Sequence, residues 1–277
     1  MIKLDFLNHY PRLKWKLYHT YRFFHNSTNF IRKNSKELNP SGILFIGDGN
    51  FKEVGEEFLN YFQNLCNIKS SDNILDIGCG SGRMAVPLTK FLDSSGVYEG
   101  FDIFSSGISW CQKNISSKYT NFHFTFADIY NKEYNPNGKI KSSKFQFPYE
   151  NNYFNFIFAT SVFTHMLPED IDNYFSEIQR VLKNNGKCFF TFLLLNSSPL
   201  ESVYEKKNKI TFEKNEENFS VMYKDVPEHT IAYKENFIRS IYENHGMIIM
   251  EPIKFGSWSG RDEFLSFQDI IISIKSK

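Results

Sequence analysis

Apolar residues gather in short runs along most of the chain, and polar or glycine-containing turns separate the runs. Seven runs of five to nine residues are rich in β-branched and aromatic side chains, which favours strands. The segments between several of them have helical spacing, and alternation of strands with helices is typical of a parallel sheet covered on both faces. We expect strands at 73–77, 97–102, 122–127, 154–160, 187–195, 247–253 and 268–275.

Two helices and one hairpin are marked most clearly. Apolar residues recur at helical spacing from Val54 to Leu65, and a second helix is expected from Pro168 to Lys183, closed by Asn185-Gly186. The last two strands are joined by Lys254 to Phe267, which lacks the helix that a parallel crossover needs. We therefore predict a terminal antiparallel hairpin.

Two connections are much longer than the others. They run from Ile129 to Tyr153 and from Asn196 to Tyr233. Long loops at the carboxyl edge of a parallel sheet commonly recognise substrates, so we expect the acceptor of any reaction there.

Charge divides the chain into two expected parts. Residues 1–40 carry eight Lys and Arg against two acidic residues, a net charge of +6, and the 277-residue chain as a whole carries +1. We expect a basic, aromatic, helical N-terminal extension at 1–40 and one folded domain at 41–277. The extension is interpreted as a lid packed on the domain, or as an arm for a membrane surface or another anionic partner.

The overall composition excludes several classes. A charge of +1 argues against a generally basic, DNA-binding protein, and no apolar run approaches the roughly 20 residues that span a bilayer. The first residues lack the apolar core of a secretory signal. The four cysteines form no CxxC pair, so we predict no metal and a reducing, cytoplasmic location.

The stretch from Ile74 to Arg83 carries the clearest chemistry. A strand ends in Asp76 and runs into three glycines that alternate with small residues, Gly78, Gly80 and Gly82. Glycine lets the backbone approach a ligand closely, and a following helix would offer free N–H groups to an anion. Arg83 stands where a dinucleotide-binding GxGxxG motif needs its third glycine, which weakens a dehydrogenase interpretation.

Two more acidic residues follow strands in the same order. Asp102 ends the second strand and is placed to accept hydrogen bonds from ribose hydroxyls, and Asp128 ends the third, placed to meet an adenine amino group. One acid after a strand is usually a helix cap, but three on successive strands form a stronger pattern.

With these residues the chain resembles the class I S-adenosylmethionine-dependent methyltransferases. The resemblance rests on ILDIGCGSGR, the strand end at Asp102, FADIY, FIFATSVFTHML and EIQRVLKNNGKCFFTFLLL, and covers roughly residues 50–277. It implies an α/β, Rossmann-like fold of seven strands with the last strand antiparallel, and S-adenosylmethionine as cofactor with S-adenosylhomocysteine as product. The cofactor-binding residues that it implies are Asp76, Gly78, Cys79, Gly80 and Gly82 at the methionine end, Asp102 and Ile103 at the ribose, and Asp128 and Ile129 at the adenine.

Departures from the family pattern limit the substrate class. Asn155 stands where many relatives have an early acidic residue, so no acidic catalytic role is expected there. The chain has no [DN]PP[FY] tetrad and no Pro-Cys dipeptide, which argues against methylation of DNA bases.

The candidate catalytic residue is His165, just after the fourth strand. A hydroxyl acceptor benefits from a general base, and a neutral imidazole serves that role; the alternative is that His165 only packs or closes a loop. The candidates for acceptor binding are Trp258, as an aromatic platform, Arg261, as a grip on phosphate or carboxylate, and Tyr223 in the long loop. Arg261 could instead pair with Asp262 or Glu263.

The sequence thus predicts a methyltransferase that acts, in the leading hypothesis, at oxygen on a small molecule or biosynthetic precursor. A nucleotide-linked or phosphorylated sugar would suit Arg261. The alternatives are an RNA or protein methyltransferase that uses the basic extension, and a non-catalytic binding protein on the same fold.

Overall fold

A computed structural model describes residues 38–40, 50–196 and 210–276 of the chain. The predicted N-terminal extension therefore lies outside the described residues, except for its last three. A short apolar run at 43–46 and part of the second long connection also lie outside them. Within the described ranges, no helix is long and apolar enough to cross a membrane.

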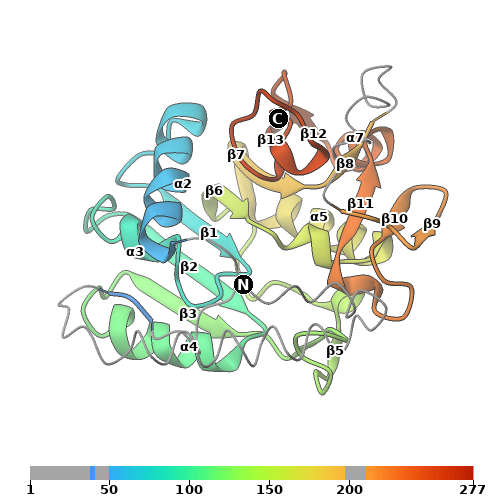
Figure 1. The fold of residues 1–277 in the computed structure, drawn as a ribbon. Helices are drawn as coiled ribbons and strands as arrows, with labels where there is room; N and C mark the ends of the chain where they lie inside the picture. Colours follow the sequence, from blue (N-terminus) through green and yellow to red (C-terminus); the bar gives the residue numbers. More distant parts are fainter. Residues whose placement is uncertain (1–37, 41–49, 197–209, 277) are drawn as a thin grey trace, which may run out of the picture.

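Seven strands form the central sheet, in the order β12-β13-β7-β6-β1-β2-β3 (Figure 1). This confirms the predicted seven-stranded, Rossmann-like architecture. The strands are β1 (Asn73–Ile77), β2 (Val97–Asp102), β3 (Phe122–Phe126), β6 (Phe154–Ala159), β7 (Leu182–Phe192), β12 (Met247–Ile249) and β13 (Asp269–Lys275).

The sheet is parallel except at β13. β1 pairs in parallel with β2 and β6, β2 with β3, and β6 with β7, whereas β13 runs antiparallel to both β7 and β12. The predicted terminal hairpin is confirmed. The six strands other than β13 run in the same direction and end at one edge of the sheet, and the loop between β12 and β13 lies at that same edge.

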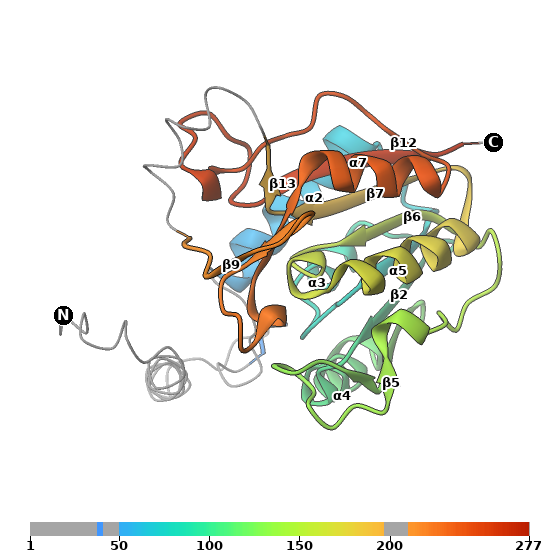
Figure 2. The same ribbon diagram turned by 90° about the vertical axis from the view of Figure 1, so that its right-hand side faces the viewer.

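Helices cover both faces of the sheet. Buried residues of α5 (Pro168–Val181) and α7 (Glu235–Asn244) belong to one apolar cluster, and these two helices lie on the face turned toward the viewer in Figure 2. Buried residues of α2 (Phe51–Cys66), α3 (Ala85–Leu88) and α4 (Ser105–Cys111) belong to the other. A π-helical segment, η3 (Gln112–Ser116), continues α4.

Phenylalanine supplies much of this core. Phe62 of α2 packs against three aromatic residues of the sheet, with ring centroids 4.6 to 5.2 Å apart. Edge-to-face and tilted contacts of this kind add to the free energy of burial. The three are Phe156, Phe158 and Phe189.

Two elements differ from the sequence-based expectation. The helix after the glycine turn has only four residues, Ala85–Leu88, because turns occupy the segment up to Met84. Helix α5 ends at Val181 rather than Lys183, and β7 begins at Leu182. Asn185, with a left-handed backbone of φ 61°, lies between Leu182 and Lys187, where the pairing of β7 with β6 is irregular.

The second long connection forms a small sheet of its own, which the sequence did not predict. Its order is β8-β11-β10-β9, and β8 follows β7 directly. The small sheet therefore stands at the carboxyl edge of the central sheet. Its strands are β8 (Leu194–Leu195), β9 (Lys214–Asn215), β10 (Phe219–Val221) and β11 (Ile231–Lys234), with a 3-10 turn, η6 (Pro227–His229), before β11.

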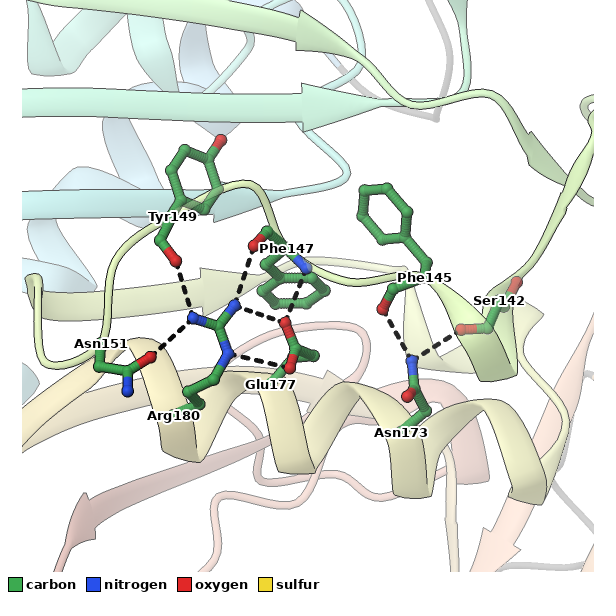
Figure 3. A network of polar contacts seen from close by, with 8 residues as sticks. All are labelled: Ser142, Phe145, Phe147, Tyr149, Asn151, Asn173, Glu177 and Arg180. Atoms are coloured by element: carbon green, nitrogen blue, oxygen red, sulfur yellow. Dashed lines mark hydrogen bonds and ion pairs between the residues drawn. The ribbon is translucent and has the colours of Figure 1, made fainter.

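The first long connection is held against α5 (Figure 3). It contains β4 (Ile129–Tyr130), β5 (Ile140–Lys141) and the turn η4 (Ser142–Lys144). The Arg180 guanidinium donates to the carbonyls of Phe147 and Tyr149 at 2.9 and 2.8 Å and pairs with Glu177. The Asn173 amide donates to two further carbonyls of the connection. These bonds fix a segment that has little regular structure.

Candidate active site

The turn between β1 and α3 holds three glycines in the left-handed region. Gly78, Gly80 and Gly82 have φ values of 76°, 54° and 78°, which other residues rarely adopt. The backbone N–H groups of Gly78 and Cys79 donate to the carbonyl of Phe101, at 2.9 and 3.1 Å. The turn is thereby fixed to the end of β2.

The space around the turn differs from one glycine to the next. A Cβ at Gly78 would lie 2.4 Å from Cγ2 of Val162, whereas a Cβ at Gly80 would have nothing within 4 Å. Gly78 therefore serves close packing, and Gly80 borders open space at the carboxyl edge. That space suits a ligand that lies directly on the backbone.

Asp76 lies under the turn with only part of its hydrogen-bonding capacity used. The residue is 1% exposed, and its Oδ2 accepts from the Tyr98 hydroxyl at 2.6 Å, while its Oδ1 has no partner among the described residues. Burial raises the pKa of Asp76 to about 8. A buried carboxylate oxygen without a donor is costly for a protein, and a bound cationic or N–H group would offset that cost.

Asp102, at the end of β2, binds the loop on either side of it. Its Oδ2 accepts from the Gly80 N–H and its Oδ1 from the Phe104 N–H, both at 2.7 Å. Burial raises the pKa of Asp102. Each oxygen retains a second lone pair, so the carboxylate can still accept from hydroxyls. Ile103 is half-buried against the apolar cluster beside it.

The third acidic residue sits in a looser environment. The carboxylate of Asp128 lies 3.6 Å from Nζ of Lys139, in a half-exposed ion pair. Its neighbour Ile129 is 2% exposed and packs in the core as part of β4. The Asp128 carboxylate can therefore meet a polar group at the surface, whereas the Ile129 side chain packs in the core.

Three features of these residues suit S-adenosylmethionine. The orphaned Oδ1 of Asp76 suits an amino group, the open space at Gly80 suits a chain laid on the backbone, and Asp102 keeps acceptor capacity for a diol. The three features occupy one edge of the sheet, at the ends of β1 and β2.

The four cysteines, Cys79 of the glycine turn among them, have buried side chains. They are Cys66, Cys79, Cys111 and Cys188, and burial raises the pKa of Cys66 to about 12. No cluster of three or more potential metal ligands occurs in the part of the chain that the structure describes.

His165 ends a 3-10 turn, η5 (Phe163–His165), directly before α5. Its Nδ1 lies 2.9 Å from the carbonyl of Glu228, so the Nδ1–H tautomer donates there. Burial lowers the pKa of His165, which keeps the imidazole neutral. The His165 and Tyr134 rings make a T-shaped contact, with ring centroids 5.2 Å apart.

Tyr223 lies beside a pair of residues that the sequence did not identify together. Its ring is 4.9 Å from that of His229, centroid to centroid, and Nδ1 of His229 lies 2.8 Å from both carboxylate oxygens of Glu133. No pattern in the sequence indicated Glu133, because it lies 96 residues from His229 along the chain.

Trp258 lies in the interior and not at a rim. The residue is 1% exposed, and its indole N–H donates to Oδ2 of Asp269 at 2.6 Å. The same carboxylate accepts from the N–H groups of Leu194 and Gly256, also at 2.6 Å. In this arrangement Trp258 ties the loop before β13 to β13 itself, Asp269 joins β13 to β8, and the ring is not exposed for an acceptor to stack on.

Arg261 lies on the same hairpin but nearer to solvent. Its guanidinium carbon is 4.3 Å from the centroid of the Phe255 ring, and its Nε donates to the hydroxyl of Ser259 at 3.3 Å. Arg261 and Phe255 line, with Lys254, a groove of about 550 Å³. The sequence-based candidates therefore fall into separate places: the acidic and glycine residues at the ends of β1 to β3, His165 with Tyr223 near the small sheet, and Arg261 on the hairpin.

The fold and the residues at the carboxyl edge of the sheet agree with the family to which part of the sequence is similar. Residues 75–190 match the family described as "Methyltransferase domain". Residues 75–190 thus carry a methyltransferase domain, and the seven-stranded sheet that contains them has the fold of the class I S-adenosylmethionine-dependent methyltransferases.

Particular relatives show how far the likeness extends. The chain is 26% identical over 120 residues to 2-phytyl-1,4-naphtoquinone methyltransferase of Trichormus variabilis, covering 43% of this chain and 46% of the relative. The matched part is thus about half the length of that curated relative.

Solved structures share the fold. A SAM-dependent methyltransferase from Methanosarcina mazei is 20% identical, with a TM-score of 0.51, covering 76% of this chain and 96% of that one. Magnesium protoporphyrin IX methyltransferase from Synechocystis PCC 6803, solved with bound SAH, is 16% identical, with a TM-score of 0.51, covering 93% and 99%.

Proposed function

We propose that this chain transfers a methyl group from S-adenosylmethionine to an oxygen of a small molecule or biosynthetic precursor. One observation carries the proposal: a left-handed glycine turn borders open space above a buried carboxylate, Asp76, that lacks a donor on one oxygen. The cofactor, when bound, supplies a methyl group on a positively charged sulfur.

Each residue of the edge has a role in this proposal. Asp76 and the backbone of Gly78 to Gly82 hold the methionine end, and Cys79 lies within that turn. Asp102 with Ile103 holds the ribose, and Asp128 with Ile129 holds the adenine. Support comes from the positions of these residues at the ends of three neighbouring parallel strands, where ligands of such sheets bind.

The acceptor site is proposed between the small sheet and the hairpin. The groove beside Arg261 is lined by Lys254 and the Phe255 ring and also by the carboxylates of Asp262 and Glu263, so an acceptor there meets groups of both charges. An acceptor that carries both hydroxyls and an anionic group, such as a nucleotide-linked or phosphorylated sugar, matches this mixed lining. The named relatives act on small organic molecules by their titles, which supports a small acceptor.

A hydroxyl acceptor must lose a proton as the methyl group arrives. Two imidazoles, His165 and His229, stand at this edge and are able to accept it. Burial lowers the pKa of His165 and keeps it neutral, which a base requires.

A matched pair of glycine variants tests the cofactor site. Gly80 and Gly246 have similar backbones, with φ 54° and 63°, and a Cβ at either would meet nothing within 4 Å. Gly80→Ala and Gly246→Ala should each cost about 1 kcal/mol of unfolding free energy. We expect only Gly80→Ala to weaken S-adenosylmethionine binding, by tenfold or more in calorimetry, because the new methyl occupies the ligand's space.

Equal cofactor affinity of the two glycine variants would contradict this site. The reaction itself is tested with S-adenosylmethionine that carries a labelled methyl group, added with the protein to a low-molecular-mass extract of the source cell. Mass spectrometry then identifies the labelled product, and an O-methylated small molecule is expected.

A further inference from the structure

A carboxylate and an imidazole form a close pair at the carboxyl edge, outside the residues assigned to the cofactor. Nδ1 of His229 lies 2.8 Å from each carboxylate oxygen of Glu133. The side chain of Glu133 is 8% exposed and that of His229 is 26% exposed. The pair is therefore largely withdrawn from water, where a charged hydrogen bond is stronger than at a surface.

Direct contacts connect this pair to the glycine turn. Val162 lies against Gly78, and its carbonyl accepts from the N–H of His165 at 2.9 Å. The imidazole of His165 donates to the carbonyl of Glu228, the residue next to His229. The pair thus stands a few side chains from the turn that is proposed to hold the cofactor.

Both members of the pair are held in one orientation. Oδ1 of Asn131 accepts from the backbone N–H of Glu133 at 3.0 Å, and its amide donates to the carbonyl of His165 at 3.3 Å. The Tyr223 ring packs on His229 from the other side. The charged or titratable groups that face His229 are Glu133, His165 and Tyr223.

We propose that His229 is the general base of the methyl transfer and that Glu133 is its positioning residue. This inference rests on the proposed function. A hydrogen bond from Nδ1–H to the carboxylate fixes the tautomer that leaves the lone pair on Nε2 free to accept a proton.

The step balances as a simple displacement. The hydroxyl oxygen of the acceptor attacks the methyl carbon and forms the O–C bond, while the C–S bond breaks and its electron pair stays on sulfur. The hydroxyl proton moves to Nε2 of His229. The products are the methyl ether, S-adenosylhomocysteine and an imidazolium paired with the Glu133 carboxylate.

Charge favours this pair over His165 as the proton acceptor. With a neutral imidazole the Glu133 and His229 pair carries −1 before transfer, and the bound cofactor would supply +1 on its sulfur; after transfer both the pair and the sulfur would be neutral. His165 donates to a neutral carbonyl, which stabilises an imidazolium less than a carboxylate does. His165 instead holds the turn that presents His229.

Histidine variants test the assignment, with labelled S-adenosylmethionine as methyl donor and the source-cell extract as acceptor mixture. His229→Gln should lower the initial rate of methyl transfer about 100-fold, and leave cofactor affinity by calorimetry unchanged. Its remaining rate should rise with pH without a plateau. Glu133→Gln should lower the rate about tenfold, and His165→Gln should keep the shape of the wild-type pH profile.

A matched control and a rescue separate catalysis from structure. His123 makes a comparable pair with Glu99, at 2.8 Å, away from this edge on β3, so His123→Gln should keep the wild-type rate. Added imidazole should restore part of the rate of His229→Ala, which a purely structural role would not allow.

Two results would overturn the proposal: a wild-type rate and pH profile in His229→Gln, or, in His165→Gln alone, loss of the plateau that the wild-type rate reaches at high pH. Failure of the wild-type protein to bind S-adenosylmethionine would instead refute the proposed function, and is measured first.

Discussion

Two carboxylates are buried at the same edge of the central sheet, yet they are bonded in opposite ways. Asp76 and Asp269 are each 1% exposed. Asp76 accepts one hydrogen bond and leaves an oxygen without a partner, whereas Asp269 accepts three N–H groups at 2.6 Å. Asp269 joins strands, whereas Asp76 keeps one oxygen for the ligand proposed above.

The pKa values of the two groups follow the same contrast. Burial raises the pKa of Asp76 to about 8, and that of Asp269 to about 7, where three donors oppose the effect of burial. A ligand that brought donors to Asp76 would favour its ionised form. The fold has thus left one acid unsatisfied where the cofactor is proposed and satisfied the other completely.

The largest expected effect is on stability, from Asp269→Asn. Oδ1 of Asp269 accepts from the Gly256 N–H and Oδ2 from Leu194 and Trp258, so an amide nitrogen must face at least one N–H group. We expect the unfolding free energy to fall by about 2 kcal/mol or more in urea titrations. Cofactor affinity of the folded variant should stay at the wild-type value; a loss of binding without a loss of stability would reverse the roles assigned here.

Asp76→Asn should give the complementary result. Since burial raises the pKa of Asp76 to about 8, the carboxyl group is mostly protonated at pH 7 without cofactor, and the amide keeps an oxygen for the Tyr98 hydroxyl; the unfolding free energy should therefore change by less than about 1 kcal/mol. S-adenosylmethionine affinity should fall about tenfold in calorimetry, equivalent to about 1.4 kcal/mol, because the free acceptor is replaced by a donor. Unchanged affinity would show that Asp76 does not face the ligand.

The smallest effect is a difference in pH dependence without cofactor. A carboxyl group with a raised pKa in the folded state keeps a proton that the unfolded chain has released, so stability falls as pH rises. Asp269 contributes this slope between about pH 4 and 7 and Asp76 between about pH 4 and 8, by at most about 1.4 kcal/mol per pH unit each.

Each of the two variants should flatten the slope of unfolding free energy against pH above about pH 4, because each removes one carboxyl group with a raised pKa. An unchanged slope in either variant would mean that the pKa of that carboxyl group is not raised in the folded state.

The sequence predicted the parts of the fold that repeat a simple pattern. The strands β1, β2, β3 and β6 lie within one residue of the expected bounds, because each apolar run ends at a turn or an acid. The small sheet was missed, because its strands have two to four residues and no periodicity. The early part of β7 includes the left-handed Asn185, which no apolar pattern indicates.

Candidate site residues at the ends of successive strands could be predicted from the sequence, whereas pairs from distant segments could not. The order of Asp76, Asp102 and Asp128 follows from adjacent parallel strands. The bond between Glu133 and His229 depends on two long connections meeting in space, and the burial of Trp258 depends on Asp269 across the hairpin. These are tertiary contacts, which local spacing does not encode.

The buried indole of Trp258 gives the protein a built-in optical probe. A tryptophan shielded from water emits at shorter wavelength than an exposed one, and this ring is hydrogen-bonded to the carboxylate that fastens the hairpin. In a variant that keeps Trp258 and replaces Trp15 and Trp110 by Phe, a red shift of emission that precedes the loss of circular dichroism would therefore report the hairpin coming away from the sheet while the rest of the domain is still folded. The opening of one joint can then be followed without an added label.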